Sequence, residues 1–237
     1  MSYKRILLKI SGEALQNKEK GLNHDPEILA TIAAQFRQML DQGAEIAVVV
    51  GGGNIFRGLA GAGSGTDRTT GDFMGMLATV INSMAIQNAL EGEGIHTRVM
   101  TAISMPAIAE PFIRRKAVRH LEKGRVVIFG AGTGNPYFTT DSAAALRASE
   151  INADVLMKAT KVDGIYTADP MTDPTATRFD KISYQDALSR QLKVMDAAAF
   201  SLCMENDIPI VVFDFFKENG MVEVFNGKKS GTLVTQG

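Results

Sequence analysis

Four short segments of this 237-residue sequence combine residue types that can bind and neutralise an anion. Each follows an apolar run, and they cover Ser11–Glu13, Gly51–Arg57, Gly130–Asp141 and Ala159–Asp169. Glycines allow backbone N–H groups to approach a ligand closely, lysine and arginine supply positive charge, and hydroxyl groups add further donors. Together these groups are suited to binding phosphate.

The first two segments lie beside basic residues. Lys9 interrupts an apolar run just before Ser11 and Gly12, which suits an ammonium group aimed at phosphates over a glycine turn. A solvent-facing lysine on an edge strand would give the same pattern. Gly51-Gly52-Gly53 has more glycine than a turn needs, and Arg57 follows four residues later, able to make a bidentate phosphate contact. A flexible connector is the alternative for the glycines.

The third and fourth segments are rich in polar groups. The stretch from Gly130 to Asp141 holds three glycines, three threonines, an asparagine and two aromatic rings, and it leads into a predicted helix. A helix N-terminus favours phosphate. An N-cap role explains Asp141 but not the rest of this loop. In the fourth segment Asp163-Gly164 and Asp169-Pro170 are turn signals, and spacing alone slightly favours a plain hairpin.

Several other kinds of site are excluded. The sequence contains neither G-x-x-x-x-G-K-[ST] nor G-x-G-x-x-G, so it lacks the P-loop and Rossmann phosphate motifs. His24, His96 and His120 do not cluster and no H-E-x-x-H occurs, which argues against a zinc site. With 25 basic and 26 acidic residues the net charge is −1, so we expect no nucleic-acid partner.

Composition and cysteine content indicate a globular protein of the cytoplasm. Hydrophobic residues make up 45% and charged residues 22%, which excludes a disordered chain or a fibre. No uninterrupted apolar run approaches the roughly 18 residues of a membrane span, and Lys9 ends the first apolar stretch too early for a signal peptide. We therefore expect no membrane partner. Cys203 is the only cysteine, which fits a reducing compartment, and we expect a buried thiol.

Short β-rich runs alternate with longer helical ones along the chain. Strands are predicted at residues 3–10, 45–50, 96–101, 125–129, 154–158 and 208–213, with an edge strand at 232–234. Helices are predicted from Pro26 to about Gly43, at 71–90, at 105–122, from Asp141, after a capping box at Ser183 and Asp186, and at 196–206.

This alternation predicts an α/β fold with a mostly parallel sheet covered on both faces, because the strands are continuously apolar. Ligands of such sheets bind beyond the carboxyl ends of the strands. The four polar segments all follow strands, so we expect them to meet at one end of the sheet.

Taken together, the motifs resemble those of the bacterial uridylate (UMP) kinases, a branch of the amino acid kinase superfamily. The resemblance covers essentially the whole chain in the same order. It rests on the following stretches: Lys9–Glu13, Gly51–Gly58, Asp72–Thr79, Gly132–Asp141, Lys158–Pro170 and Lys193–Asp196. The loop T-G-N-P-Y-F-T-T-D, which ends at Asp141, and the stretch from Asp72 to Thr79 are the parts most specific to this branch.

The resemblance implies a single amino-acid-kinase-like domain over residues 1–237, folded as a three-layer αβα sandwich. About 1–155 would hold the acceptor nucleotide and about 156–237 would hold ATP. The implied ATP contacts are Lys9, Ile10, Ser11, Gly12, Gly53, Arg57, Thr160, Tyr166 and Asp169. The implied UMP contacts are Gly52, Asp72, Thr133, Gly134, Asn135, Pro136, Tyr137, Phe138, Thr139 and Thr140. The charged residues implied around the transferred phosphoryl group are Lys9, Arg57, Asp141 and Asp196.

The same resemblance implies the reaction ATP + UMP giving ADP + UDP, by direct in-line transfer, in pyrimidine nucleotide (CTP) biosynthesis. Mg²⁺ would accompany ATP and be held mainly by ATP oxygens, without a metal site built from protein side chains. Family members imply a homohexamer activated by GTP and inhibited by UTP. The stretch from Gln16 to Asn23, where many relatives carry a GTP-sensing segment, matches only loosely.

Two other functions remain open from the sequence. One is a kinase of the same superfamily that acts on a carboxylate, a carbamate or an isoprenoid phosphate, against which the loop from Thr133 to Asp141 speaks. The other is a binding protein without catalysis, such as a store for metal oxyanions or a nucleotide sensor. Joint retention of Lys9, Arg57, Asp141 and Asp196 argues for an active site.

Overall fold

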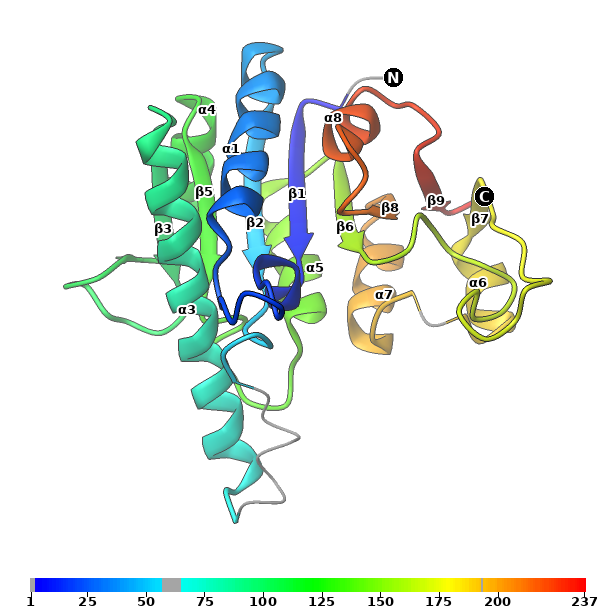
Figure 1. The fold of residues 1–237 in the computed structure, drawn as a ribbon, viewed down its shortest axis with the longest axis horizontal. Coiled ribbons are helices and arrows are strands. Elements are labelled where there is room, and N and C mark those ends of the chain that lie inside the picture. The colour runs from blue at the N-terminus through cyan, green and yellow to red at the C-terminus, as the bar shows by residue number, and fades with distance from the viewer. Residues whose placement is uncertain (1–2, 57–64, 193) are drawn as a thin grey trace.

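The structure is a computed structural model that describes residues 3–56, 65–192 and 194–237 (Figure 1). The described strands are β1 (Arg5–Ile10), β2 (Glu45–Val50), β3 (Thr97–Thr101), β4 (Glu110–Pro111), β5 (Val126–Gly130), β6 (Val155–Thr160), β7 (Lys181–Ser183), β8 (Ile210–Asp214) and β9 (Gly231–Thr235). The described helices are α1 (Pro26–Asp41), α3 (Arg68–Gly92), α4 (Arg114–Glu122), α5 (Thr140–Ile151), α6 (Tyr184–Ser189), α7 (Ala197–Glu205) and α8 (Gly220–Phe225), with a 3-10 turn η1 (Gly12–Leu15).

The strands of the described chain form one nine-stranded sheet in the order β4-β3-β5-β2-β1-β6-β8-β9-β7. Every neighbouring pair is parallel except β8 and β9. Strands β5, β2, β1, β6 and β8 are consecutive neighbours, so their carboxyl ends lie in a row at one end of the sheet (Figure 1). The mostly parallel α/β sheet expected from the sequence is confirmed, and the polar segments begin at this end of it.

Helices cover both faces of the sheet and make the three-layer sandwich. On one face α1, α3 and α8 pack against alternate strand residues such as Ile6, Leu8 and Ile10 of β1. On the opposite face α4, α5, α6 and α7 pack against the intervening residues, such as Leu7. Because side chains alternate along a strand, Lys9 continues the row of Leu7 toward α5.

Most of the predicted elements are confirmed to within a few residues of their ends. Asp25 caps α1, its carboxylate accepting a hydrogen bond from Glu27 N, and the Ser183 hydroxyl caps α6 by accepting one from Asp186 N. Cys203 is a free, buried thiol in α7, and burial raises its pKa to about 12. Its chemistry is therefore that of a small core side chain rather than of a nucleophile.

Two predictions about elements are wrong, and one alternative is excluded. Residues 105–122 are not one helix, because α4 begins only at Arg114, after Pro106 and Pro111 have pushed the preceding backbone out of the helical region. Asp141 is not the cap of α5, since Thr139 holds that position. The tail is not an edge strand: β9 lies between β8 and β7, and β7, only three residues long, forms the edge.

Helix α3 is long and apolar enough, by length and composition, to cross a membrane, although polar residues interrupt its apolar run. It packs against α1, β3 and β5, and 44% of its most apolar stretch is buried. Its N-terminal turns project beyond the carboxyl ends of the strands (Figure 1). Asp72 lies on this projecting part, and therefore on the side of the predicted site.

Candidate active site

Three charged side chains meet at the carboxyl ends of the two central strands. Lys9 of β1 and Lys158 of β6 are directly paired across the parallel ladder. Asp141, in the first turn of α5, receives both ammonium groups: Lys9 Nζ lies 2.9 Å from its Oδ1 and Lys158 Nζ lies 2.7 Å from its Oδ2. None of the three side chains is more than 15% exposed. The alternative of a solvent-facing edge-strand lysine is therefore wrong for Lys9.

The protonation of this cluster follows from burial and mutual charge. Burial by itself would raise the pKa of Asp141, but the ammonium groups of Lys9 and Lys158 outweigh it and hold that pKa below its ordinary value. Burial lowers the pKa of Lys158, and the positive charge of Lys9 adds to that, while Asp141 offsets part of it. In this cluster two ammonium groups thus share one carboxylate, while Asp196 supplies a second negative charge nearby that raises the pKa of Lys158.

Asp196 joins this centre to the next helix. It caps α7, accepting a hydrogen bond from Ala199 N at 2.9 Å. Its carboxylate also accepts hydrogen bonds from the hydroxyl groups of Thr139 and Ser142, at the start of α5. Asp196 therefore ties the N-termini of α5 and α7 together beside Asp141.

Glycines allow the segments after β1 and β2 to touch. A Cβ on Gly12 would lie 2.5 Å from the carbonyl oxygen of Gly51, so backbone occupies the space of a side chain. A Cβ on Gly52 would lie 2.8 Å from the carbonyl oxygen of Gly75 and from the Cβ of Ala78 in α3. These contacts require glycine at both positions, which a flexible connector would not.

A first cavity of about 170 Å³ lies between α3 and the loop that precedes α5. Its walls include most of the residues predicted for the acceptor: Gly52, Asp72, Thr133, Asn135, Phe138, Thr139 and Thr140. Tyr137 N donates a hydrogen bond to Asp72 Oδ2 at 2.8 Å, which holds the loop on α3. Arg68 Nε lies 2.9 and 3.0 Å from the two Asp72 oxygens, and its guanidinium group lies 5.5 Å from the centre of the Tyr137 ring.

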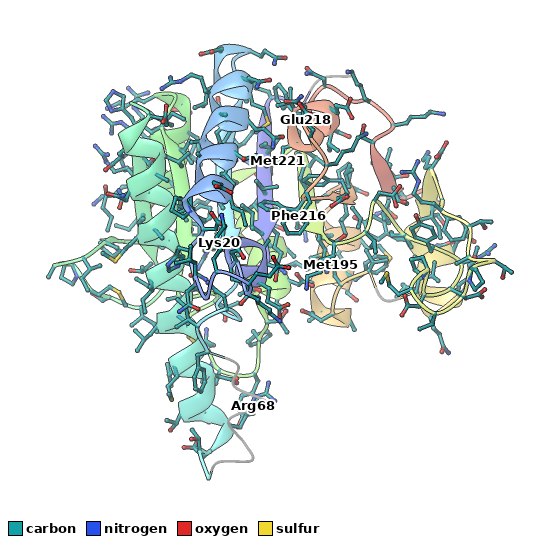
Figure 2. All side chains as sticks on the ribbon, viewed as in Figure 1. Lys20, Arg68, Met195, Phe216, Glu218 and Met221 are labelled. Carbon is teal, nitrogen blue, oxygen red and sulfur yellow. The ribbon has the colours of Figure 1, made fainter. Side chains whose placement is uncertain are left out.

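A second cavity of about 290 Å³ lies beyond the ends of β1, β6 and β8. Lys9, Ser11, Lys158, Thr160 and Phe216 are among its walls. Figure 2 shows Phe216 near the middle of the molecule, whereas Arg68 lies at the projecting end of α3. Lys9 and Lys158 border this second cavity, while Thr140, the neighbour of Asp141, borders the first. The charged centre therefore lies between the two cavities.

The model of the amino acid kinase family matches residues 4–214 of the sequence. The chain belongs to the amino acid kinase family. The structure is also similar to solved structures of full-length relatives. The crystal structure of UMP kinase from Bacillus anthracis has a TM-score of 0.96 and 39% sequence identity, covering 100% of this chain and 97% of that one.

Two further solved structures give the same result. UMP kinase from Ureaplasma parvum has a TM-score of 0.90 and 38% identity, covering 99% of this chain and 100% of that one. Uridylate kinase from Archaeoglobus fulgidus has a TM-score of 0.76 and 29% identity, with the same coverage of 99% and 100%. The family resemblance predicts an amino acid kinase fold, and the family match and these structures confirm it.

Several residues predicted to bind ATP do not line the second cavity. The Ile10 side chain is buried in the core, and Gly53 lies in the turn after β2. Tyr166 donates from its hydroxyl to Asp163 Oδ1 at 2.5 Å, on the segment between β6 and β7. Asp169 Oδ1 accepts from Met171 N at 2.9 Å in the same segment. Arg57, predicted for catalysis and ATP binding, lies outside the described residues.

The loop from Thr133 to Thr140, here called the acceptor loop, contains three residues that are predicted to contact UMP and whose backbone or packing is distinctive: Gly134, Pro136 and Tyr137. A Cβ on Gly134 would lie 3.1 Å from that of Ala102, and the φ of Gly134 is +80°, so glycine suits this close approach. Pro136 is partly buried. Tyr137 has φ 73°, unusual for a non-glycine residue, and its ring is exposed. Its contribution to the site is the N–H group bound to Asp72.

Sequence reasoning missed Lys158, Phe216 and Arg68 as site residues. Lys158 interrupts the apolar strand V-L-M-K-A-T in the same way as Lys9 interrupts its own strand, so the same sequence pattern indicates Lys158. Phe216 lies in the stretch from Asp214 to Phe216, for which the sequence left contacts to adenine open, and the structure places it in the wall of the second cavity. Arg68 lies four residues before Asp72, and only the structure shows that both it and Tyr137 contact that carboxylate.

Within residues 3–56, 65–192 and 194–237 no three His, Cys, Asp or Glu side chains are grouped to hold a metal ion. The two carboxylates at the centre are already engaged, Asp141 by lysines and Asp196 by hydroxyl and amide donors. These groups fit a divalent cation that arrives on phosphate oxygens, since they offer it no preformed cage.

Proposed function

We propose that this amino acid kinase family member transfers the γ-phosphoryl group of ATP to UMP, giving UDP and ADP, by direct in-line displacement. The observation that carries the proposal is the position of the Lys9–Asp141–Lys158 cluster between the two cavities. Three full-length relatives described as UMP or uridylate kinases support this choice of acceptor. The product UDP would feed pyrimidine nucleotide biosynthesis.

UMP would occupy the first cavity. Asp72 suits the ribose hydroxyls, because a carboxylate accepts two hydrogen bonds at once, and the loop from Thr133 to Thr140 supplies amide and hydroxyl groups. The phosphate of UMP has a second pKa near 6 and is largely a dianion at pH 7. It is therefore a competent nucleophile without a general base, and the site needs only to align it and to neutralise charge.

ATP would occupy the second cavity, with its phosphates near Lys9, Ser11 and Gly12 and its base and ribose toward Thr160, Tyr166 and Asp169. Each charge pair at about 4 Å contributes roughly 4 kcal/mol before desolvation at an effective dielectric near 20. Arg57 is proposed as a further phosphate contact. Mg²⁺ bound to the triphosphate would neutralise charge on its oxygens, with the Lys9–Asp141–Lys158 cluster completing the neutralisation.

The chain is accordingly proposed to be one functional domain, with about 1–155 holding the acceptor and about 156–237 holding ATP. Asp196 would act with Lys9, Arg57 and Asp141 around the transferred group, by fixing the start of α5. We also propose a cytoplasmic location, where both nucleotides are present and where a free Cys203 thiol is stable.

A homohexamer is proposed as the assembled form, with GTP as activator and UTP as inhibitor, as the family resemblance implies. Self-association is supported by a row of exposed apolar side chains on α3, formed by Phe73, Met74, Leu77, Ile81 and Met84. Single exposed apolar residues are normal, but a contiguous row marks an interaction surface.

The test is ADP release from MgATP, measured by a coupled spectrophotometric assay with UMP, CMP, dUMP, aspartate, glutamate and carbamate offered separately. Turnover with UMP and not with the carboxylates or carbamate is expected. Turnover with a carboxylate or carbamate instead would assign the chain to another activity of the family. No turnover with any acceptor, in protein shown to bind ATP, would favour a binding function.

A further inference from the structure

Lys158 stands in a position where the fold by itself would place an apolar residue. Side chains of β6 alternate between the two cores, and Leu156, on the α5 face, is fully buried. Lys158 is the next residue on that face, and its side chain is only 14% exposed. Burying an ammonium group costs free energy, so its retention there calls for a compensating interaction.

The contacts of Lys158 leave part of its binding capacity unused. Its Nζ donates to Asp141 Oδ2 at 2.7 Å and to the carbonyl oxygen of Val194 at 2.6 Å. An ammonium group has three N–H donors, so one remains beyond these two contacts. Lys158 also forms part of the wall of the second cavity. The third N–H bond of the Lys158 ammonium group is therefore available beside the cavity proposed for ATP.

A purely structural role does not account for this arrangement. Lys9 alone already pairs with Asp141, so a second cation is not needed to compensate that carboxylate. Lys9 and Lys158 are register partners on adjacent strands, and like charges at such positions repel each other. Asp196, the other nearby carboxylate, is engaged by hydroxyl and amide donors. Among the described residues, Asp141 is the one carboxylate within 4 Å of either ammonium group, and Asp196 acts on Lys158 only from farther away.

We propose that Lys158 is a catalytic residue that binds the β- and γ-phosphate oxygens of the donor, opposite Lys9 and across Asp141. The inference rests on the proposed function, because it assigns a residue to that reaction. During transfer the bond from the γ-phosphorus to the β,γ-bridging oxygen breaks, and a bond to an oxygen of the acceptor phosphate forms. The electron pair stays on the bridging oxygen, which becomes part of ADP. Lys158 keeps its proton and donates a hydrogen bond to the charge that develops there.

The first test uses the variants Lys158→Met and Lys158→Gln in the full-length protein. Methionine keeps the length of the chain without charge or donors, and glutamine keeps a donor group without charge. Binding of the imido analogue of ATP and of AMP is measured by calorimetry for each. Lys181→Met is the matched control, because Lys181 is an exposed strand lysine on β7, at the far edge of the sheet.

Both variants at position 158 are expected to bind the imido analogue at least 10-fold more weakly, while AMP binding changes less than threefold. The turnover number with UMP should fall about 100-fold, in the range seen when one donor to a developing oxyanion is removed. The KM for UMP should stay within threefold. Lys181→Met should match the wild type in every one of these measurements.

Equal loss of affinity for the imido analogue and for AMP would overturn the proposal, since it would point to a structural role. Unchanged turnover in Lys158→Gln would overturn it as well. Thermal melting shows whether each variant folds. If Lys158→Met does not fold, the measurements on Lys158→Gln decide the test. A further outcome is that the wild type does not phosphorylate UMP while the variants at position 158 still lose affinity for the imido analogue and keep their affinity for AMP. In that case the proposed reaction fails, and Lys158 remains a phosphate ligand.

Discussion

Lys9 and Lys158 are register partners on adjacent parallel strands, and their ammonium groups contact the two oxygens of a single carboxylate, Asp141. Like charges on neighbouring strands are unfavourable unless a counter-charge lies between them. The first turn of α5 supplies that counter-charge from the face on which both lysines lie. The arrangement places two ammonium groups at the carboxyl ends of β1 and β6, where parallel sheets bind their ligands.

Lys9→Ala should lower the turnover number far more than it weakens UMP binding. The reason is that Lys9 borders the second cavity, on the proposed donor side, and is not among the described residues that line the first cavity. Loss of one charged donor to the transferred group is expected to cost about 100- to 1000-fold in turnover. Steady-state kinetics with UMP varied at saturating MgATP measures both quantities. An unchanged turnover number would remove Lys9 from the chemistry.

Asp141→Asn should destabilise the fold in a pH-dependent way. Because the folded-state pKa of Asp141 is lowered, its contribution to stability is fully present above its ordinary pKa and is lost as pH falls through the folded-state value. At pH 7 the variant should be about 3–5 kcal/mol less stable, since two buried cations lose their counter-ion. The gap between the two proteins should shrink at acid pH, where wild-type Asp141 is also neutral.

Urea unfolding of both proteins between pH 7 and pH 3 measures this gap. A difference that stays constant over the whole range would contradict the charge argument and would point to a packing defect in the variant instead.

Asp72→Ala should weaken UMP binding and leave ATP binding unchanged. The carboxylate borders the first cavity and also holds the acceptor loop through Tyr137 N. Hydrogen bonds to a charged group contribute about 1.5–3 kcal/mol each, which corresponds to roughly 10- to 100-fold in affinity. Calorimetry with UMP gives the loss, and titration with the imido analogue of ATP serves as the internal control. Wild-type affinity for UMP would exclude Asp72 from the site.

Gly52→Ala should lower both stability and UMP affinity. The new methyl group would lie 2.8 Å from the carbonyl oxygen of Gly75 and from the Cβ of Ala78, so β2 and α3 would have to separate. Overpacking of this kind costs about 1–3 kcal/mol. Gly92→Ala is the matched control, because nothing lies within 4 Å of its added Cβ at the end of α3. That control should be as stable as the wild type or slightly more so, by thermal melting.

Strand positions and the place of the site could be predicted from the sequence, because continuous apolar strands and the residues after them leave strong local signals. The strand at 45–50 and the cap at Asp25 are examples. The helix predicted over 105–122 was wrong because hydrophobic content was given more weight than Pro106 and Pro111. The order of β7 and β9 could not be predicted, since pairing between segments about fifty residues apart leaves no local pattern.

In the candidate site, a single residue type with characteristic neighbours leaves a signal in the sequence, whereas a contact between two distant residues does not. Lys9 and Gly52 are recognisable from their own neighbours in the sequence. The role of Asp141 was ambiguous, because an aspartate at the start of a helix reads as a cap, and only the structure shows Thr139 in that position. The contact between Asp72 and Tyr137 spans 65 positions and depends on a left-handed backbone at Tyr137, which the sequence does not reveal.

The apolar row on α3 should hold copies of the chain together. Leu77 and Ile81 are each 50% exposed and lie one helical turn apart, in the middle of the row. Burying two such side chains contributes about 1.5–3 kcal/mol each, whereas glutamates there would place charge inside the contact.

The double variant L77E/I81E should therefore run near the monomer mass of 25.5 kDa in size-exclusion chromatography with light scattering, while the wild type runs at a multiple of it. Gln185→Glu, at an exposed polar position of α6 on the opposite face of the sheet, is the control and should keep the wild-type mass. A wild type that is already monomeric would contradict the interface.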